Sequence, residues 1–173
     1  MHKFKNKNTK NLIGAIYFKN RVRSWEELPE QDRVWCKQHI LEAISQATST
    51  RPLLLASVGI IISFETKSES WPELIPSISN LLQSTELHIL YTGVSVLLEV
   101  VKSWQYANIR FLLFTILRWY QSNKRIPLNQ VINQLFPVLL SLASKLEKNS
   151  NSLDALFLLK SIVKMYNYSI RVV

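Results

Sequence analysis

The chain has 173 residues, of which 47% are hydrophobic and 19% are charged. That composition is sufficient for one packed domain and excludes an intrinsically disordered chain. The formal net charge of +9 is concentrated in residues 1–25, which carry seven basic residues and no acidic residue. The rest of the chain is close to neutral, so the basic character belongs to the N-terminal region.

The scarcity of certain residue types argues against most kinds of catalytic and metal site. The single cysteine, Cys36, cannot form an internal disulfide, and three scattered histidines have no metal-ligand spacing. None of the three glycines belongs to a phosphate-binding loop, and the GxSxG, HExxH and CxxC motifs do not occur. Cys36 and His39 are one helical turn apart, an arrangement that is commonplace on a helix surface. We therefore expect no catalytic residue, no metal, no cofactor and no enzymatic activity.

Residues 1–11 form a basic, Lys/Asn-rich lead that we expect to be disordered. They lack the apolar core of a secretory signal, and their composition differs from the Arg- and Ser-rich mitochondrial presequences, so no targeting segment is expected. The longest uncharged run, 126–144, has 19 residues but includes four Asn and Gln residues. Since a bilayer span needs about 20 apolar residues, membrane insertion is not expected.

Apolar residues spaced three and four apart predict helices from residue 12 onward. Residues 12–27 are predicted to be the second helix of an incomplete hairpin, and complete hairpins follow at 29–67, 71–104 and 127–171. Before the clearest helix, Ser84 or Thr85 is available as the N-cap. The apolar stripe of that helix consists of Leu87, Leu90, Tyr91, Val94, Leu97, Leu98 and Val101.

A proline opens the first helix of each predicted hairpin, at Pro29, Pro72 and Pro127. The first two are 43 residues apart, within the range of about 40–47 residues that is typical of HEAT repeats. The next spacing is 55 residues, and the surplus falls in the apolar segment 107–121. That segment is either an extra helix packed on the repeats or an insertion that the fold does not require. We predict an all-α fold, a right-handed HEAT-repeat α-solenoid (α-α superhelix).

Several sequence motifs resemble the N-terminal region of the importin-β (karyopherin-β) superfamily. The sequence AIYFKN at residues 15–20, followed by Trp25, is similar to a motif of that region. Residues 29–44 resemble its second repeat, and 68–82 resemble its W-P-x-L segment. Residues 92–106 and 127–144 are most similar to the branch of importins seven and eight. The resemblance covers nearly all of the chain except 1–11 and 107–121.

The resemblance implies the function of a nuclear transport receptor. It would bind Ran-GTP, import cargo proteins and nucleoporins, and it would be found in the nucleus, in the cytoplasm and at the nuclear envelope and pore. Ran-GTP and cargo would bind competing conformations of one flexible solenoid. Because the helix is expected to bury Ile16 and Val22, the polar residues Lys19, Asn20 and Arg23 are the candidates for Ran binding.

Large side chains within these motifs are expected to fill the gaps between neighbouring helices rather than to bind partners. They are Trp25, Trp71, Phe136 and Pro137. Two alternative functions stay open. One is a general HEAT-repeat scaffold in a protein complex. The other, which we do not favour, is a helical module that binds RNA through the basic residues of 1–25.

Overall fold

The computed structural model describes the backbone of residues 2–68, 71–115, 128–148 and 153–170, and the side chains of 11–65, 71–103, 134–148 and 153–168. The regular elements of these residues are all helices, and no strand occurs among them. The prediction of an all-α fold is confirmed for this part of the chain. The chain divides into two compact units, Met1–Ser68 and Glu69–Val173.

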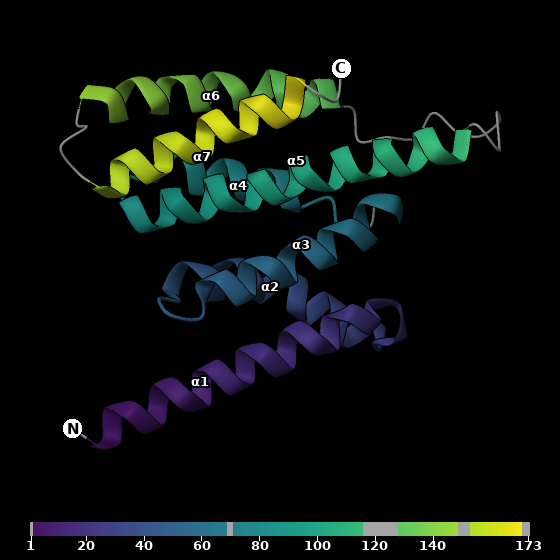
Figure 1. The fold of residues 1–173 in the computed structure, drawn as a ribbon, viewed down its shortest axis with the longest axis vertical. Coiled ribbons are helices and arrows are strands. Elements are labelled where there is room, and N and C mark those ends of the chain that lie inside the picture. Colours follow the sequence, from purple (N-terminus) through teal and green to yellow (C-terminus); the bar gives the residue numbers. More distant parts are fainter. Residues whose placement is uncertain (1, 69–70, 116–127, 149–152, 171–173) are drawn as a thin grey trace. The chain divides into compact units, whose positions relative to one another are not determined.

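Unit 1 contains three α-helices and a short 3-10 helix. They are α1 (His2–Arg21), η1 (Val22–Glu27), α2 (Glu30–Gln46) and α3 (Arg51–Ser68) (Figure 1). Helix α3 contacts each of the other elements, so it forms the centre of the unit. Its buried face is an apolar stripe, Val58, Ile61 and Ile62, which packs in the same core as Val22 and Ile44.

The α2–α3 connection is stabilised by an arginine that caps a helix C-terminus. The Arg51 side chain donates to the backbone oxygens of Ile44 and Ser45 at 3.3 and 3.4 Å. These carbonyls belong to the last turn of α2, where the i+4 N–H partners of a helix interior are missing, although the Ile44 carbonyl also accepts from the Ala47 N–H at 3.2 Å. A cation at this position also complements the helix dipole, so Arg51 supports the reversal of the chain.

Unit 2 contains four α-helices. They are α4 (Leu74–Leu82), α5 (Leu87–Thr115), α6 (Leu128–Lys148) and α7 (Leu153–Ile170) (Figure 1). Helix α5 packs against α4 and α7, and α6 packs against α4 and α7. The core is made of the apolar stripes of these helices, including Ile78, Leu97, Leu139, Leu158 and Ile162, each no more than 1% exposed.

Three features differ from the expected organisation. Helix α1 begins at His2, so residues 2–11, which were expected to be disordered, form the first half of this helix. Residues 107–115 continue α5 without a break, whereas 116–121 of the extra segment lie outside the described residues. In the α4–α5 turn, Ser84 Oγ accepts a hydrogen bond from the Glu86 N–H, and it is the Glu86 carbonyl that accepts from Ile89 and Leu90. The division into a half repeat and hairpins stays a prediction.

Two helical glycines are expected to respond in opposite directions to alanine. A Cβ at Gly93 would lie 3.0 Å from Leu81 Cβ, whereas a Cβ at Gly14 would have no atom within 4 Å. We expect Gly93→Ala to lower the free energy of unfolding by about 1–3 kcal/mol through overpacking of α4 on α5. We expect Gly14→Ala to raise it by up to about 1 kcal/mol, because alanine favours helix more than glycine. Urea unfolding measures both, and equal shifts would contradict the close α4–α5 approach.

Candidate functional site

The polar residues selected from the sequence lie near the junction of α1 and η1. Lys19 is half-buried and Asn20 is exposed, both in the last turn of α1. Arg23 is exposed in η1, where Ser24 has non-helical backbone angles (φ −98°, ψ 46°). The structure thus brings the three side chains to one end of unit 1. Their role in binding stays a prediction.

The expected orientation of α1 is partly wrong. Val22 is fully buried, but Ile16 is 44% exposed, and Ala15 lies on the buried side instead. Among the described residues, the main contacts of helix α1 are with α3 and η1, so a narrow stripe of its surface is covered. A small residue at 15 suits such a contact, and Ile16 lies about 100° further round the helix.

The Cys36–His39 pair is not arranged for nucleophilic catalysis. His39 Nδ1 lies 2.8 Å from the backbone oxygen of Trp35, and its ring stacks on the Trp35 ring at 4.6 Å. Burial, together with the Asp32 carboxylate, raises the pKa of the Cys36 thiol. The raised pKa disfavours the thiolate, which is the nucleophilic form of cysteine.

The large rings singled out in the sequence are not all buried. Trp25 and Trp71 are buried, as expected. Phe136 is half-buried and stacks on Tyr166 with ring centroids 4.7 Å apart. Pro137 is exposed, contrary to the expectation that it fills a gap between helices.

A buried carboxylate that the sequence analysis did not select joins three elements of unit 1. Glu65 on α3 is 4% exposed and accepts a hydrogen bond of 2.6 Å from Trp25 Nε1 of η1. Its other oxygen pairs with Lys37 Nζ of α2 at 3.0 Å. The available signal is its position, because Glu65 continues the buried stripe of Val58, Ile61 and Ile62 at helical spacing. An acid there needs partners inside the protein.

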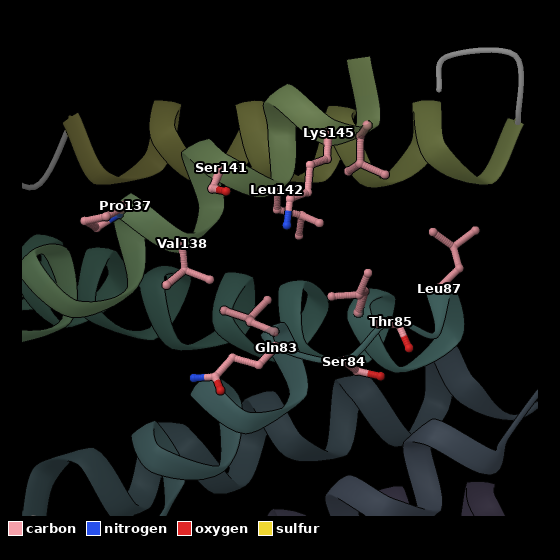
Figure 2. A pocket seen from close by; sticks show the side chains of 12 residues that line it. Gln83, Ser84, Thr85, Leu87, Pro137, Val138, Ser141, Leu142 and Lys145 are labelled. Atoms are coloured by element: carbon pink, nitrogen blue, oxygen red, sulfur yellow. The ribbon is translucent and has the colours of Figure 1, made fainter. Parts of the chain in front are cut away.

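The candidate site is a cleft of about 750 Å³ in unit 2, between the α4–α5 turn and α6 (Figure 2). One side is lined by Leu82, Gln83, Ser84, Thr85, Leu87 and Leu90. The other side is lined by Pro137, Val138, Ser141, Leu142, Lys145 and Leu146. The tight turn after α4, closed by the Gln83 and Ser84 N–H groups on Asn80 and Leu81, leaves this space beside α6.

The chemistry of the cleft suits a ligand that is mostly apolar. Its walls are mostly leucine, valine and proline side chains, and its polar groups are hydroxyls, one amide and one ammonium. Figure 2 shows the Lys145 side chain reaching from α6 toward the α4–α5 turn. Among the lining residues Lys145 carries the only charge, and none is a histidine, cysteine or carboxylate that could act as a base or nucleophile. An apolar group next to a carboxylate is the complementary ligand.

The part of the chain that the structure describes was also searched for metal-binding clusters and for membrane-spanning helices. No cluster of three or more His, Cys, Asp or Glu side chains is arranged there to hold a metal ion. Within the same residues, no helix combines the length and hydrophobicity that crossing a bilayer would require.

Comparison with known proteins finds similarity to part of a much longer yeast protein. The chain is 25% identical over 179 residues to "Nonsense-mediated mRNA decay protein 5" of Saccharomyces cerevisiae. The aligned stretch covers 91% of this chain but only 16% of the yeast protein. No protein-family model matches the chain, and no solved structure matches it.

These comparisons overturn the resemblance to the importin-β superfamily. No family model matches the chain, and the relative that is found is named as an mRNA decay protein, not as an importin. The assignment to the importins is therefore wrong, and so is the function of a nuclear transport receptor that binds Ran-GTP. Import cargo proteins and nucleoporins were expected as partners only from that resemblance, so nothing now supports them. The resemblance arose because these motifs consist mainly of apolar and helix-forming residues, which any packed helical hairpin requires.

Proposed function

We propose that the chain is a non-catalytic protein-binding module that holds a peptide segment of a partner in the cleft of unit 2. The observation that carries this proposal is the apolar cleft between the α4–α5 turn and α6, with Lys145 directed into it. As its architecture we propose a right-handed HEAT-type solenoid, in which hairpins stack and present such grooves. Nuclear and cytoplasmic localisation stays a prediction.

The partner segment is proposed to carry an apolar side chain and an acidic residue. The apolar side chain would replace water against Leu87, Leu90 and Leu142, and burial of apolar area is the main source of affinity in such pockets. The carboxylate would pair with Lys145 and so set the direction of the segment.

The name of the yeast relative connects that protein with nonsense-mediated mRNA decay. This chain spans only 16% of the length of that protein, so the role of the whole yeast protein is used only to choose which partners to test first. Protein components of mRNA decay are the first partners that we propose to test.

Selection of short random peptides on the intact chain tests the proposed function. We expect enriched peptides to combine a large apolar residue with Asp or Glu. Ser141→Trp, which fills the cleft, is expected to abolish their binding. Lys145→Glu should weaken it about tenfold, a loss of about 1.4 kcal/mol. The measurement is fluorescence anisotropy with labelled peptide.

Lys148→Glu is the matched control, since this lysine is exposed in the last turn of α6 but does not line the cleft. It should bind the peptides as the native chain does. Failure of the selection to enrich any peptide, or equal binding by the Ser141→Trp variant, would contradict the proposal. Binding of an RNA oligonucleotide in place of peptides would also contradict it.

A further inference from the structure

Helix α7 has two apolar faces, and in the part of the chain that the structure describes only one of them is covered. Ala155, Leu158, Ile162 and Met165 are each no more than 3% exposed and pack toward α5 and α6. On the opposite side lie Leu153, Leu156, Phe157 and Val163, which are 72%, 49%, 56% and 55% exposed. We call these four residues, with Lys160 and Lys164 between and beside them, the α7 outer face.

The outer face follows the spacing of a helix-binding surface. Leu153, Leu156 and Phe157 are separated by three and four residues, and Lys160 and Val163 continue the same side of the helix for two more turns. Partner helices usually bind through anchors at this spacing.

Helix α6 adds an exposed leucine next to this face. The stacked rings of Phe136 and Tyr166, and the hydrogen bond of 3.3 Å from Tyr166 Oη to the Phe136 carbonyl, fix the register of the antiparallel pair. Leu140 is one turn after Phe136, and Val163 is about one turn before Tyr166, so both lie at the same level of the pair. Leu140 is 57% exposed. The uncovered apolar surface therefore extends from α7 toward α6.

The charge of the outer face selects its partner. Lys160 and Lys164 are both exposed, and Lys164 Nζ lies 6.0 Å from the centre of the Tyr168 ring. The acidic residue of α7, Asp154, is exposed in the first turn, three residues before Phe157, so it lies at one edge of the face. The face thus combines leucine and phenylalanine side chains with two lysines, which outnumber the one carboxylate at its edge.

A second copy of the chain is a poor partner for this face. Pairing the outer face with itself would bring four lysines, Lys160 and Lys164 of each copy, into one interface, and an excess of like charge there is destabilising. Acidic residues that flank the apolar stripe of a different helix would instead pair with both lysines.

We propose that the α7 outer face binds an amphipathic helix of a partner protein whose apolar stripe is flanked by Glu or Asp. The partner's apolar residues pack on Leu153, Leu156 and Phe157, and its acids pair with Lys160 and Lys164. This surface shares no residue with the cleft, and because both sites are proposed to bind apolar, acidic segments, the cleft is filled by Ser141→Trp when the outer face is tested.

The probe is a synthetic helical peptide of about five turns, with leucines at i, i+3 and i+7 spacing and glutamates beside them. A second peptide has every glutamate replaced by lysine, and a third is a scrambled form of the first. Binding to the intact chain is followed by fluorescence anisotropy. The chain variants are Phe157→Ser and the double variant Lys160→Glu/Lys164→Glu, each made in a chain whose cleft is filled by Ser141→Trp, with Lys148→Glu in the same chain as the control.

We expect micromolar binding of the glutamate peptide and at least tenfold weaker binding of the other two. Phe157→Ser should weaken binding about tenfold, and the double charge variant should come to favour the lysine peptide. Lys148→Glu should bind as the parent Ser141→Trp chain does. Circular dichroism should show that all variants keep the native helix content, since the substituted side chains are exposed.

Three results would overturn the proposal. The first is equal binding of the glutamate and lysine peptides. The second is a chain dimer, detected by sedimentation, that Phe157→Ser dissociates, because the occupant would then be a second copy. The third is binding to vesicles that contain anionic lipid without binding to the glutamate peptide, which would assign the face to a membrane surface.

Discussion

Replacing Glu65 with alanine is expected to lower the free energy of unfolding by about 3–5 kcal/mol, the size typical of breaking a buried ion pair by removal of one partner. The substitution leaves Lys37 Nζ and Trp25 Nε1 without the carboxylate that each contacts at 3.0 and 2.6 Å. Because these partners lie on α2 and η1, the loss affects the whole of unit 1. Urea unfolding followed by circular dichroism measures the change.

Control substitutions separate the network from a general effect of losing an acid. Glu42 is exposed on α2 and bonds only across one helical turn, to Gln46, so Glu42→Ala should change stability by less than about 0.5 kcal/mol. Replacing Glu65 and Lys37 together with methionine should recover much of the loss, because no charge is then left unpaired. A loss of under 1 kcal/mol for Glu65→Ala, about that of a surface site, would show that the carboxylate does not join these elements.

Truncating Leu158 to alanine is expected to lower the free energy of unfolding by about 2–5 kcal/mol, since it removes buried methyl groups and leaves a cavity. Leu158 is fully buried on α7, which packs against both α5 and α6. Leu156→Ala is the matched control, because it makes the same change two residues earlier on the 49% exposed side of the same helix. That control should cost no more than about 0.5–1 kcal/mol.

Thermal and urea unfolding of the two leucine variants test which face of α7 is buried. If Leu156→Ala proved as destabilising as Leu158→Ala, both faces would be covered, and the α7 outer face would not be available to a partner. The comparison therefore bears on the architecture of unit 2 and on the proposed binding surface at once.

The failure of the family assignment has a physical origin. Motifs such as WPELIP at 71–76 begin with a ring that fills a gap and continue with residues that start an amphipathic helix. Trp71 and Leu74 are indeed buried, so the motif correctly indicated which side chains pack in the core. Packing requirements are shared by many helical proteins, and only a site with specific chemistry distinguishes their functions.

The sequence by itself determined that the described chain is helical and where most of its helices lie. The spacing of Leu87, Leu90, Val94 and Leu97 predicts α5, and Pro29 and Pro127 immediately precede α2 and α6. These features depend on local properties, namely the helical period and the restricted backbone of proline, so they can be read without knowledge of distant contacts.

Only the tertiary structure decided which faces are covered and which side chains meet. The sequence alone cannot show that Ala15 rather than Ile16 is buried, that Glu65 receives the Trp25 N–H from 40 residues away, or that the α4–α5 turn and α6 enclose a cleft. Each of these depends on contacts between elements far apart in the chain, and several arrangements of the same helices satisfy the same apolar pattern. Packing selects among them, because it alone determines how much of each helix surface is removed from water.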